Sequence, residues 1–245
     1  MSHLIELNNI SKIYKMGKVE SKVLDNVSLT IDQGEYVSVC GPSGCGKSSL
    51  LSIMGLLSAA NGGSYLFDGE DVTKLKQNQL ARMRNRDIGF IFQAFNLSQD
   101  MTTEENIELP LTYRKDMKRK ERAEAVQNIM DKMYLTEFRK YFPGQLSGGQ
   151  QQRVAIARAL AGKPRIILAD EPTGNLDSKS AAVVMEIFNR MNDEGTTICL
   201  VTHDPRSAAY ANRKIHLFDG KIIQDPNAAN SANDEENSGF NKAEQ

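Results

Sequence analysis

A glycine-rich segment, GPSGCGKS, occupies residues 41–48 and matches the pattern G-x-x-x-x-G-K-[S/T]. Its glycines allow backbone N–H groups to close around phosphate oxygens, and a cation and a hydroxyl follow at the end of the segment. We expect Lys47 to reach the β- and γ-phosphates of a nucleotide and the Ser48 hydroxyl to ligate Mg²⁺. The segment therefore predicts a nucleoside triphosphate site, to which we assign Gly41, Pro42, Ser43, Gly44, Cys45, Gly46, Lys47, Ser48 and Ser49.

The residues around this segment predict the two elements that must position it. An apolar run over 36–40 is typical of a buried strand, and the apolar residues over 48–57 are typical of a buried helix. The alternative is a glycine-rich turn with a solvated lysine, which the strand–helix context disfavours. Because Lys47 and the helix N-terminus favour a thiolate, we also expect Cys45 to react with a maleimide and bound Mg²⁺-ATP to slow this reaction. The alternative is a side chain that points into the core, where the reagent does not reach it.

Two adjacent acids end a second apolar run, RIILADE, over residues 165–171. On its own this pattern is weak, because many buried strands end in an acid. Together with the glycine-rich loop it supplies two missing groups. Asp170 is expected to hold the Mg²⁺ ion, and Glu171 is expected to polarise a water molecule towards the γ-phosphate.

The string LSGGQ at residues 146–150 precedes a predicted helix. Ser147 is a plausible N-cap, and Gly148 and Gly149 allow an anion to approach the backbone closely. With this string in place, the chain resembles the nucleotide-binding domain of ABC transporters over residues 4–224. In that family two copies pair head to tail, so the resemblance implies that Ser147, Gly148, Gly149 and Gln150 complete the ATP site of a partner copy.

The resemblance also implies roles for four further residues. Tyr14 matches the aromatic residue that stacks on adenine, although packing near a strand is its alternative. Gln93, which follows IGFIF, matches the glutamine that senses Mg²⁺, as a third ligand, and faces the membrane partner, with an ordinary polar strand end as the alternative. Asp177 matches the loop that crosses the dimer interface, with an ordinary turn residue as the alternative. His203 matches the histidine that contacts the γ-phosphate, where an imidazole can donate a hydrogen bond at neutral pH.

The pattern of apolar residues predicts an α/β fold. Strands and helices alternate up to residue 92 and again after Pro164, which favours a mostly parallel sheet. Alternating apolar residues near Leu4 and near Leu29 predict antiparallel strands. The resemblance makes this a P-loop NTPase (RecA-like) core with an antiparallel β subdomain and an inserted α-helical subdomain. We expect a nucleotide-binding domain at 1–225, the helical insertion at about 94–161 and a disordered polar tail at 226–245.

Composition excludes several classes of protein. The 245 residues carry 30 basic and 31 acidic side chains, a net charge of −1, which disfavours bulk binding of nucleic acid. No apolar stretch approaches the length of a spanning helix, and the N-terminal sequence has no signal-peptide pattern. Three cysteines without a C-x-x-C pair argue against disulfides and a zinc site. We therefore expect reduced thiols and a protein that stays in the compartment where it is made.

The strings ENIELPL and DEPTGNLDS resemble the MacB/LolD/FtsE-type branch of the family. The branch implies an ATP-sandwiched homodimer at the cytoplasmic face of the inner membrane, bound to a permease and working with a periplasmic adaptor, without nucleic acid. We expect the permease to dock near Gln93 and residues 105–111. The expected function is ATP hydrolysis that drives export, lipoprotein release or mechanotransmission.

Two alternatives stay open. The chain could regulate a cell-envelope complex without transport, or it could be a soluble ABC ATPase acting on nucleic acid or ribosomes. The second is disfavoured because the chain has a single glycine-rich loop and no long coiled-coil insertion before LSGGQ.

Overall fold

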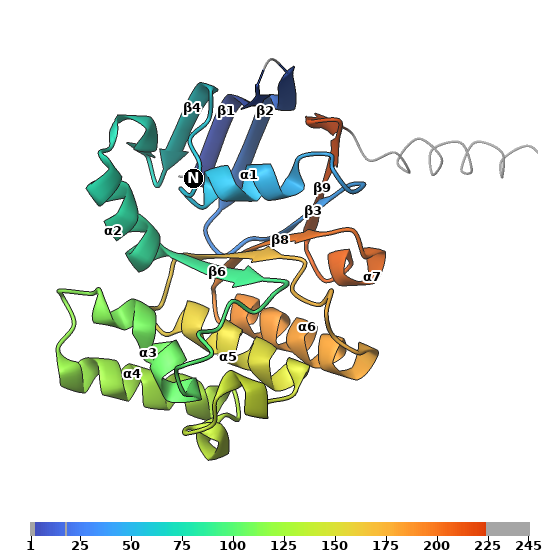
Figure 1. Ribbon diagram of the computed structural model, residues 1–245. Coiled ribbons are helices and arrows are strands. Elements are labelled where there is room, and N and C mark those ends of the chain that lie inside the picture. The colour runs from blue at the N-terminus through green and yellow to red at the C-terminus, as the bar shows by residue number, and fades with distance from the viewer. Residues whose placement is uncertain (1–2, 18, 224–245) are drawn as a thin grey trace, which may run out of the picture.

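The computed structural model describes residues 3–17 and 19–223, so the expected disordered tail at 226–245 lies outside the described residues. The chain forms a six-stranded sheet, a four-stranded sheet and flanking helices (Figure 1). Among the described residues, no helix combines the length and the apolar character needed to cross a bilayer.

The six-stranded sheet carries the predicted parallel core. Its strands lie in the order β10 (Lys221–Ile223), β9 (Arg213–Phe218), β3 (Tyr36–Cys40), β8 (Thr197–Thr202), β7 (Ile166–Asp170) and β6 (Ile88–Phe92). Only β10 is antiparallel to its neighbour. The carboxyl ends of the other five strands therefore meet at one edge, where open α/β sheets bind ligands. The predicted α/β class is confirmed.

Successive residues of the central strands face two different cores, as the period of a strand requires. In β3, Val37 and Val39 pack into one core, with the helix α1 (Lys47–Met54) and the four-stranded sheet. Tyr36 faces the other core, with the helices α5 (Gly148–Leu160) and α6 (Ser178–Asp193). Covered faces on both sides explain why these strands read as continuous apolar runs in the sequence.

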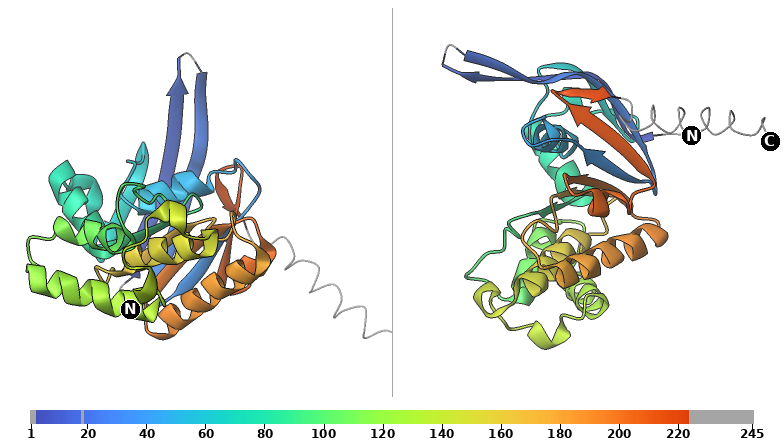
Figure 2. Two further views of the ribbon diagram at one scale, coloured as in Figure 1. Left: turned by 60° about the horizontal axis from the view of Figure 1, so that its bottom comes forward. Right: turned by 90° about the vertical axis from the view of Figure 1, so that its right-hand side faces the viewer.

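The four-stranded antiparallel sheet has the order β2-β1-β4-β5. Sequence alternation indicated its first two strands, but β1 (His3–Met16) and β2 (Val19–Asp32) are much longer than the alternating stretches. Figure 2 shows that the end of this hairpin projects beyond the rest of the sheet. The other two strands, β4 (Gly62–Phe67) and β5 (Glu70–Asp71), pair beside β1.

Residues 94–161 contain helices and no strand. They form α3 (Thr103–Thr112), α4 (Arg119–Lys132), two 3-10 turns and α5. These helices lie with α6 on the side of the six-stranded sheet opposite α1 (Figure 1). The remaining α-helices are α2 (Gln77–Asp87), which leads into β6, and α7 (Pro205–Ala208), which follows β8, and a third 3-10 turn lies at Val72–Lys74.

Candidate nucleotide-binding site

The glycine-rich loop joins β3 to α1 at the carboxyl edge of the six-stranded sheet. Two of its glycines adopt left-handed backbone conformations, with φ of 81° at Gly44 and 108° at Gly46. A Cβ at Gly46 would lie 2.6 Å from the Val23 carbonyl oxygen, so only glycine fits there. No side chain caps the N-terminus of α1, which leaves its first N–H groups free for an anion.

The side chain of Lys47 is buried against its own loop. Its Nζ donates to the carbonyl oxygens of Gly41 at 2.8 Å and Pro42 at 2.9 Å. The ammonium group thus lies in the concave side of the turn that surrounds a phosphate in this kind of loop. Ser49, in the first turn of α1, lies 3.5 Å (Oγ to Oη) from Tyr14.

Ser48 and Asp170 form the oxygen pair that the sequence assigned to Mg²⁺. The Ser48 Oγ donates to Asp170 Oδ1 at 3.4 Å, across the gap between α1 and the end of β7. Hydroxyl and carboxylate oxygens are ligands that Mg²⁺ prefers, so the donor set fits that ion. Burial raises the pKa of Asp170, and this effect outweighs the Ser48 hydrogen bond and the Lys47 charge, which lower it. Gln93, the third predicted ligand, makes no hydrogen bond to this pair in the described structure.

Glu171 and His203 lie directly beside this pair. The Glu171 Oε1 accepts the backbone N–H of His203 at 3.0 Å and contacts its ring Nδ1 at 2.7 Å, while Oε2 accepts the Thr202 hydroxyl at 3.2 Å. Glu171 itself has a φ of 48°, an uncommon conformation for a residue with a side chain. This backbone conformation directs the Glu171 side chain, which is 17% exposed, towards the end of β8.

Gln93 follows β6 and contacts the segment after Glu171. Its Nε2 donates to Asn175 Oδ1 at 3.2 Å, and Asn175 Nδ2 donates back to the Gln93 carbonyl at 3.0 Å. Arg158 of α5 donates to the carbonyls of Phe95 and Asn96, which holds the chain just after Gln93. The glutamine therefore lies where the loop 171–177 and the helices meet.

The LSGGQ residues lie at a different place. Ser147 caps α5, accepting the Gln150 N–H at 3.3 Å, while the Gln150 side chain accepts the Ser147 N–H at 2.7 Å. A Cβ at Gly149 would come within 2.8 Å of Ser180 Oγ, so the backbones of α5 and α6 are close there. Over the described part of the chain, no hydrogen bond or ion pair joins Ser147, Gly148, Gly149 or Gln150 to the glycine-rich loop.

Asp177 caps α6. Its carboxylate accepts the N–H groups of Lys179 and Ser180 and the Ser180 hydroxyl, the last at 2.6 Å, and this hydroxyl in particular lowers the pKa of Asp177. Asp177 is thus the N-cap residue of α6. Tyr14 is 42% exposed, with the Lys12 ammonium 5.1 Å from its ring centroid. Its ring is therefore accessible beside the first turn of α1.

The expectation for Cys45 is wrong. Its side chain is 4% exposed and packs in the core that contains α1, because the curled loop turns it inward. Only the backbone of Cys45 is available to a nucleotide. Sequence analysis missed three polar contacts, those of Thr202 with Glu171, Asn175 with Gln93 and Gln152 with Pro172. Only Gln152 could have been singled out from the sequence, because it lies just after LSGGQ.

The ABC transporter family model matches residues 24–174 of this chain. The "Uncharacterized ABC transporter ATP-binding protein YknY" of Bacillus subtilis is 46% identical over 220 residues, covering 90% of this chain and 95% of YknY. The "Macrolide export ATP-binding/permease protein MacB" of Escherichia coli is 44% identical over 233 residues. That match covers 95% of this chain but 36% of MacB.

Two solved structures of the cassette MJ0796 are similar in fold and sequence. The "post-hydrolysis state" dimer "bound to ADP and Pi" has a TM-score of 0.82 and 44% identity, covering 90% of this chain and 97% of that chain. The "Dimeric Structure of MJ0796, a Bacterial ABC Transporter Cassette" has a TM-score of 0.83 and 45% identity, with the same coverage.

These matches confirm the fold class, the P-loop ATPase core, and the resemblance to the MacB-containing branch. ATP is the nucleotide, and the chain is an ATP hydrolase. The individual site residues stay predictions supported by the geometry above. The chain therefore belongs to the ABC transporter family, of which it is an ATP-binding and ATP-hydrolysing member.

Proposed function

We propose that this chain hydrolyses Mg²⁺-ATP as a homodimer in which the LSGGQ segment of one copy completes the ATP site of the other. The observation that carries the proposal is the separation of two nucleotide-facing surfaces in one chain. Lys47 and Ser48 belong to the glycine-rich loop and Ser48 contacts Asp170, whereas the capped N-terminus of α5 at Ser147 makes no polar contact with them in the described residues. The dimeric MJ0796 structures support the pairing.

The chain's own residues divide the reaction between them. Lys47 and the first N–H groups of α1 hold the phosphates, while Ser48 and Asp170 would hold Mg²⁺, which neutralises phosphate charge when bound. Glu171 directly follows Asp170, the carboxylate that would hold the metal, and it accepts a proton from the attacking water. His203 holds the Glu171 carboxylate through its backbone N–H and ring, so its orientation decides where that carboxylate points.

A Glu171→Gln variant tests the homodimer. It should elute from a size-exclusion column as a monomer alone and as a dimer with Mg²⁺-ATP, because bound ATP is shared between the two copies. A dimer mass by light scattering only with ATP supports the proposal. Equal masses with and without ATP at high protein concentration contradict it.

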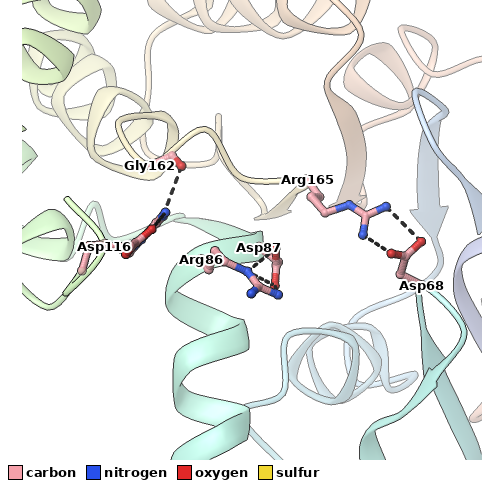
Figure 3. Close-up of polar contacts among 7 residues, drawn as sticks. Asp68, Arg86, Asp87, Asp116, Gly162 and Arg165 are labelled. Atoms are coloured by element: carbon pink, nitrogen blue, oxygen red, sulfur yellow. Dashed lines mark hydrogen bonds and ion pairs between the residues drawn. The ribbon is translucent and has the colours of Figure 1, made fainter. Parts of the chain in front are cut away.

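We also propose that the dimer drives a separate integral membrane permease. A groove of about 1100 Å³ lies between α2 and β6 on one side and the ends of α3 and α5 on the other. Exposed apolar residues line it, with Leu57 50% and Tyr113 72% exposed. Figure 3 shows polar contacts in its wall, where Arg86 pairs with the buried Asp87. Asp116 pairs with Arg114, which also donates to the Gly162 carbonyl oxygen. The groove suits a short amphipathic segment of a partner.

The docking site proposed here differs from the one expected from the sequence, near Gln93 and residues 105–111. Of residues 105–111 only Pro110 lines the groove, and Gln93 lies one residue beyond its lining residue Phe92. The side chains of Thr103 and Asn106 are buried, so they are poor positions for crosslinking. Asn106 instead holds the 98–102 turn through four hydrogen bonds.

Crosslinking from the groove tests the partner. Cysteines at Tyr113 and Asn78, which are exposed on its two sides, should capture a membrane-embedded permease in membranes of the source cell. A cysteine at the exposed Ala182 of α6, away from the groove, is the matched control. Capture of ribosomal or nucleic-acid-associated proteins from both groove positions would contradict the permease and favour the soluble alternative.

Resemblance to the MacB-containing branch supports export, lipoprotein release or mechanotransmission at the cytoplasmic face of the inner membrane, with a periplasmic adaptor as a further partner. MacB is named as an ATP-binding and permease protein in one chain, of which this chain covers 36%. That name supports pairing with a permease. A transport assay with the captured permease separates export from regulation without transport.

A further inference from the structure

Gln152 of α5 has a buried side chain with an unusual hydrogen-bonding state. It is 0% exposed, and its Nε2 donates to the Pro172 carbonyl oxygen at 2.6 Å. Its Oε1 is buried without a hydrogen-bond partner. Because a carbonyl oxygen can only accept, the amide nitrogen must face Pro172, and the contact itself fixes the orientation of the amide.

This contact joins the LSGGQ helix to the loop that carries Glu171. Gln152 lies in the second turn of α5, and Pro172 directly follows Glu171 in the chain. In the part of the chain that the structure describes, it is the only hydrogen bond between α5 and residues 171–177. Further hydrogen bonds of this loop join Asn175 to Gln93 and Thr173 to the Ser207 hydroxyl at 3.3 Å. Glu171 at its start is bonded to Val201, Thr202 and His203.

Stability alone does not explain a glutamine here. A buried acceptor without a partner is unfavourable, and an apolar side chain of similar size would exchange the unpaired Gln152 Oε1 for an unpaired Pro172 carbonyl oxygen, so glutamine does not lower the number of unpaired acceptors. Glutamine supplies a donor to one specific carbonyl, and that carbonyl belongs to the residue beside the catalytic glutamate. The geometry therefore favours a role in holding this loop at a fixed position relative to α5.

We propose that Gln152 is a positioning residue that transmits the position of the LSGGQ segment to Glu171 of the same chain. This inference rests on the proposed homodimer, in which that segment contacts the ATP held by the partner copy. Nucleotide in the partner's site then fixes the N-terminus of α5, and the Gln152–Pro172 hydrogen bond fixes the loop that aims Glu171. The contact links the two ATP sites of the dimer.

The first test replaces Gln152 by methionine, which keeps the length of the side chain and removes the donor. Gln152→Met should retain its melting temperature and its KM for ATP, while kcat falls about tenfold or more and the Hill coefficient for ATP falls towards one. The matched control is Asn192→Leu, since Asn192 Nδ2 donates to the Gly34 and Thr196 carbonyls at the opposite end of the sheet. That variant should lower the melting temperature and leave kcat per folded molecule unchanged.

A second variant makes the readout specific to the donated hydrogen bond. Gln152→Glu places a carboxylate against the Pro172 carbonyl, where only the protonated acid can donate, and burial favours the protonated form. Its kcat relative to the unmodified protein should rise as the pH falls from about 8 to about 6, whereas the ratio for Gln152→Met should stay flat. A merely structural role predicts no such rescue.

Two results would overturn the inference. The first is an unchanged kcat and Hill coefficient in Gln152→Met, and the second is a pH-independent ratio for Gln152→Glu. Dimer formation by Glu171→Gln keeps this failure separate from failure of the proposed function. If that variant dimerises with ATP while the Gln152 variants behave normally, only the role of Gln152 is wrong.

Discussion

Glu171→Gln should separate ATP binding from ATP hydrolysis. In the structure one carboxylate oxygen accepts the His203 backbone N–H at 3.0 Å, and the other accepts the Thr202 hydroxyl at 3.2 Å. A glutamine can keep the first contact through its amide oxygen. It can also keep the second, because its NH₂ group can donate to the hydroxyl, which then acts as acceptor. The shape of the site should therefore survive.

The expected loss is the contribution of the base. General-base catalysis contributes about 10²–10⁴-fold, which corresponds to about 3–5 kcal/mol at about 1.4 kcal/mol per decade. We expect kcat to fall by that factor and the dissociation constant for ATP to change by less than about tenfold. Steady-state ATPase rates and a fluorescent nucleotide titration measure the two quantities.

The matched control is Glu186→Gln, which removes the same charge from an exposed position on α6. It should change neither quantity. The assignment of Glu171 fails if Glu171→Gln keeps its turnover within about tenfold of the unmodified protein. It fails equally if binding is lost while circular dichroism shows an intact fold.

Lys47→Ala should weaken ATP binding at least about tenfold, because the phosphates lose the cation that lies against the Gly41 and Pro42 carbonyls, and a nucleotide titration checks this. Burial raises the pKa of Asp170, so the folded state binds this proton more tightly than the unfolded state. The free energy of unfolding should therefore fall as the pH rises from the ordinary pKa of the carboxyl to its raised pKa. Asp170→Asn should remove that fall and raise the melting temperature at pH 7 without nucleotide or Mg²⁺, while Mg²⁺-dependent turnover is lost; an unchanged melting curve would contradict the burial argument. Cys45 should react slowly with a maleimide, because only 4% of it is exposed, and rapid ATP-protected labelling located there by mass spectrometry would show that the loop opens.

The parallel core could be predicted because its strands are buried on both faces. The runs at 36–40, 88–92 and 166–169 coincide with β3, β6 and β7, and each is apolar at successive positions because two cores cover the sheet. The hairpin of β1 and β2 was underestimated because several side chains of its outer half, Tyr14, Lys15, Glu20 and Ser21, are exposed, so no alternation of buried residues marks it. Alternation of apolar residues ends near Ile10, although the pairing continues to Met16.

The site could be predicted where one short segment holds all its parts, and not where distant segments meet. The glycine-rich loop spans eight residues and the two acids are adjacent, so residue types and spacing are enough to identify both. Pairs such as Gln93 with Asn175 and Gln152 with Pro172 join positions far apart in the chain, and no local pattern marks them. The direction of the Cys45 side chain depends on glycine dihedrals that residue types do not determine.

The sharing of each ATP site between two copies is tested most directly by mixing two inactive variants. One chain carries Lys47→Ala, and the other carries Ser147→Arg at the capped start of α5. In a mixed dimer one site joins an intact glycine-rich loop to an intact LSGGQ segment. The account predicts ATP turnover in the mixture well above the sum of the two separate preparations. Turnover equal to that sum at every mixing ratio would contradict it.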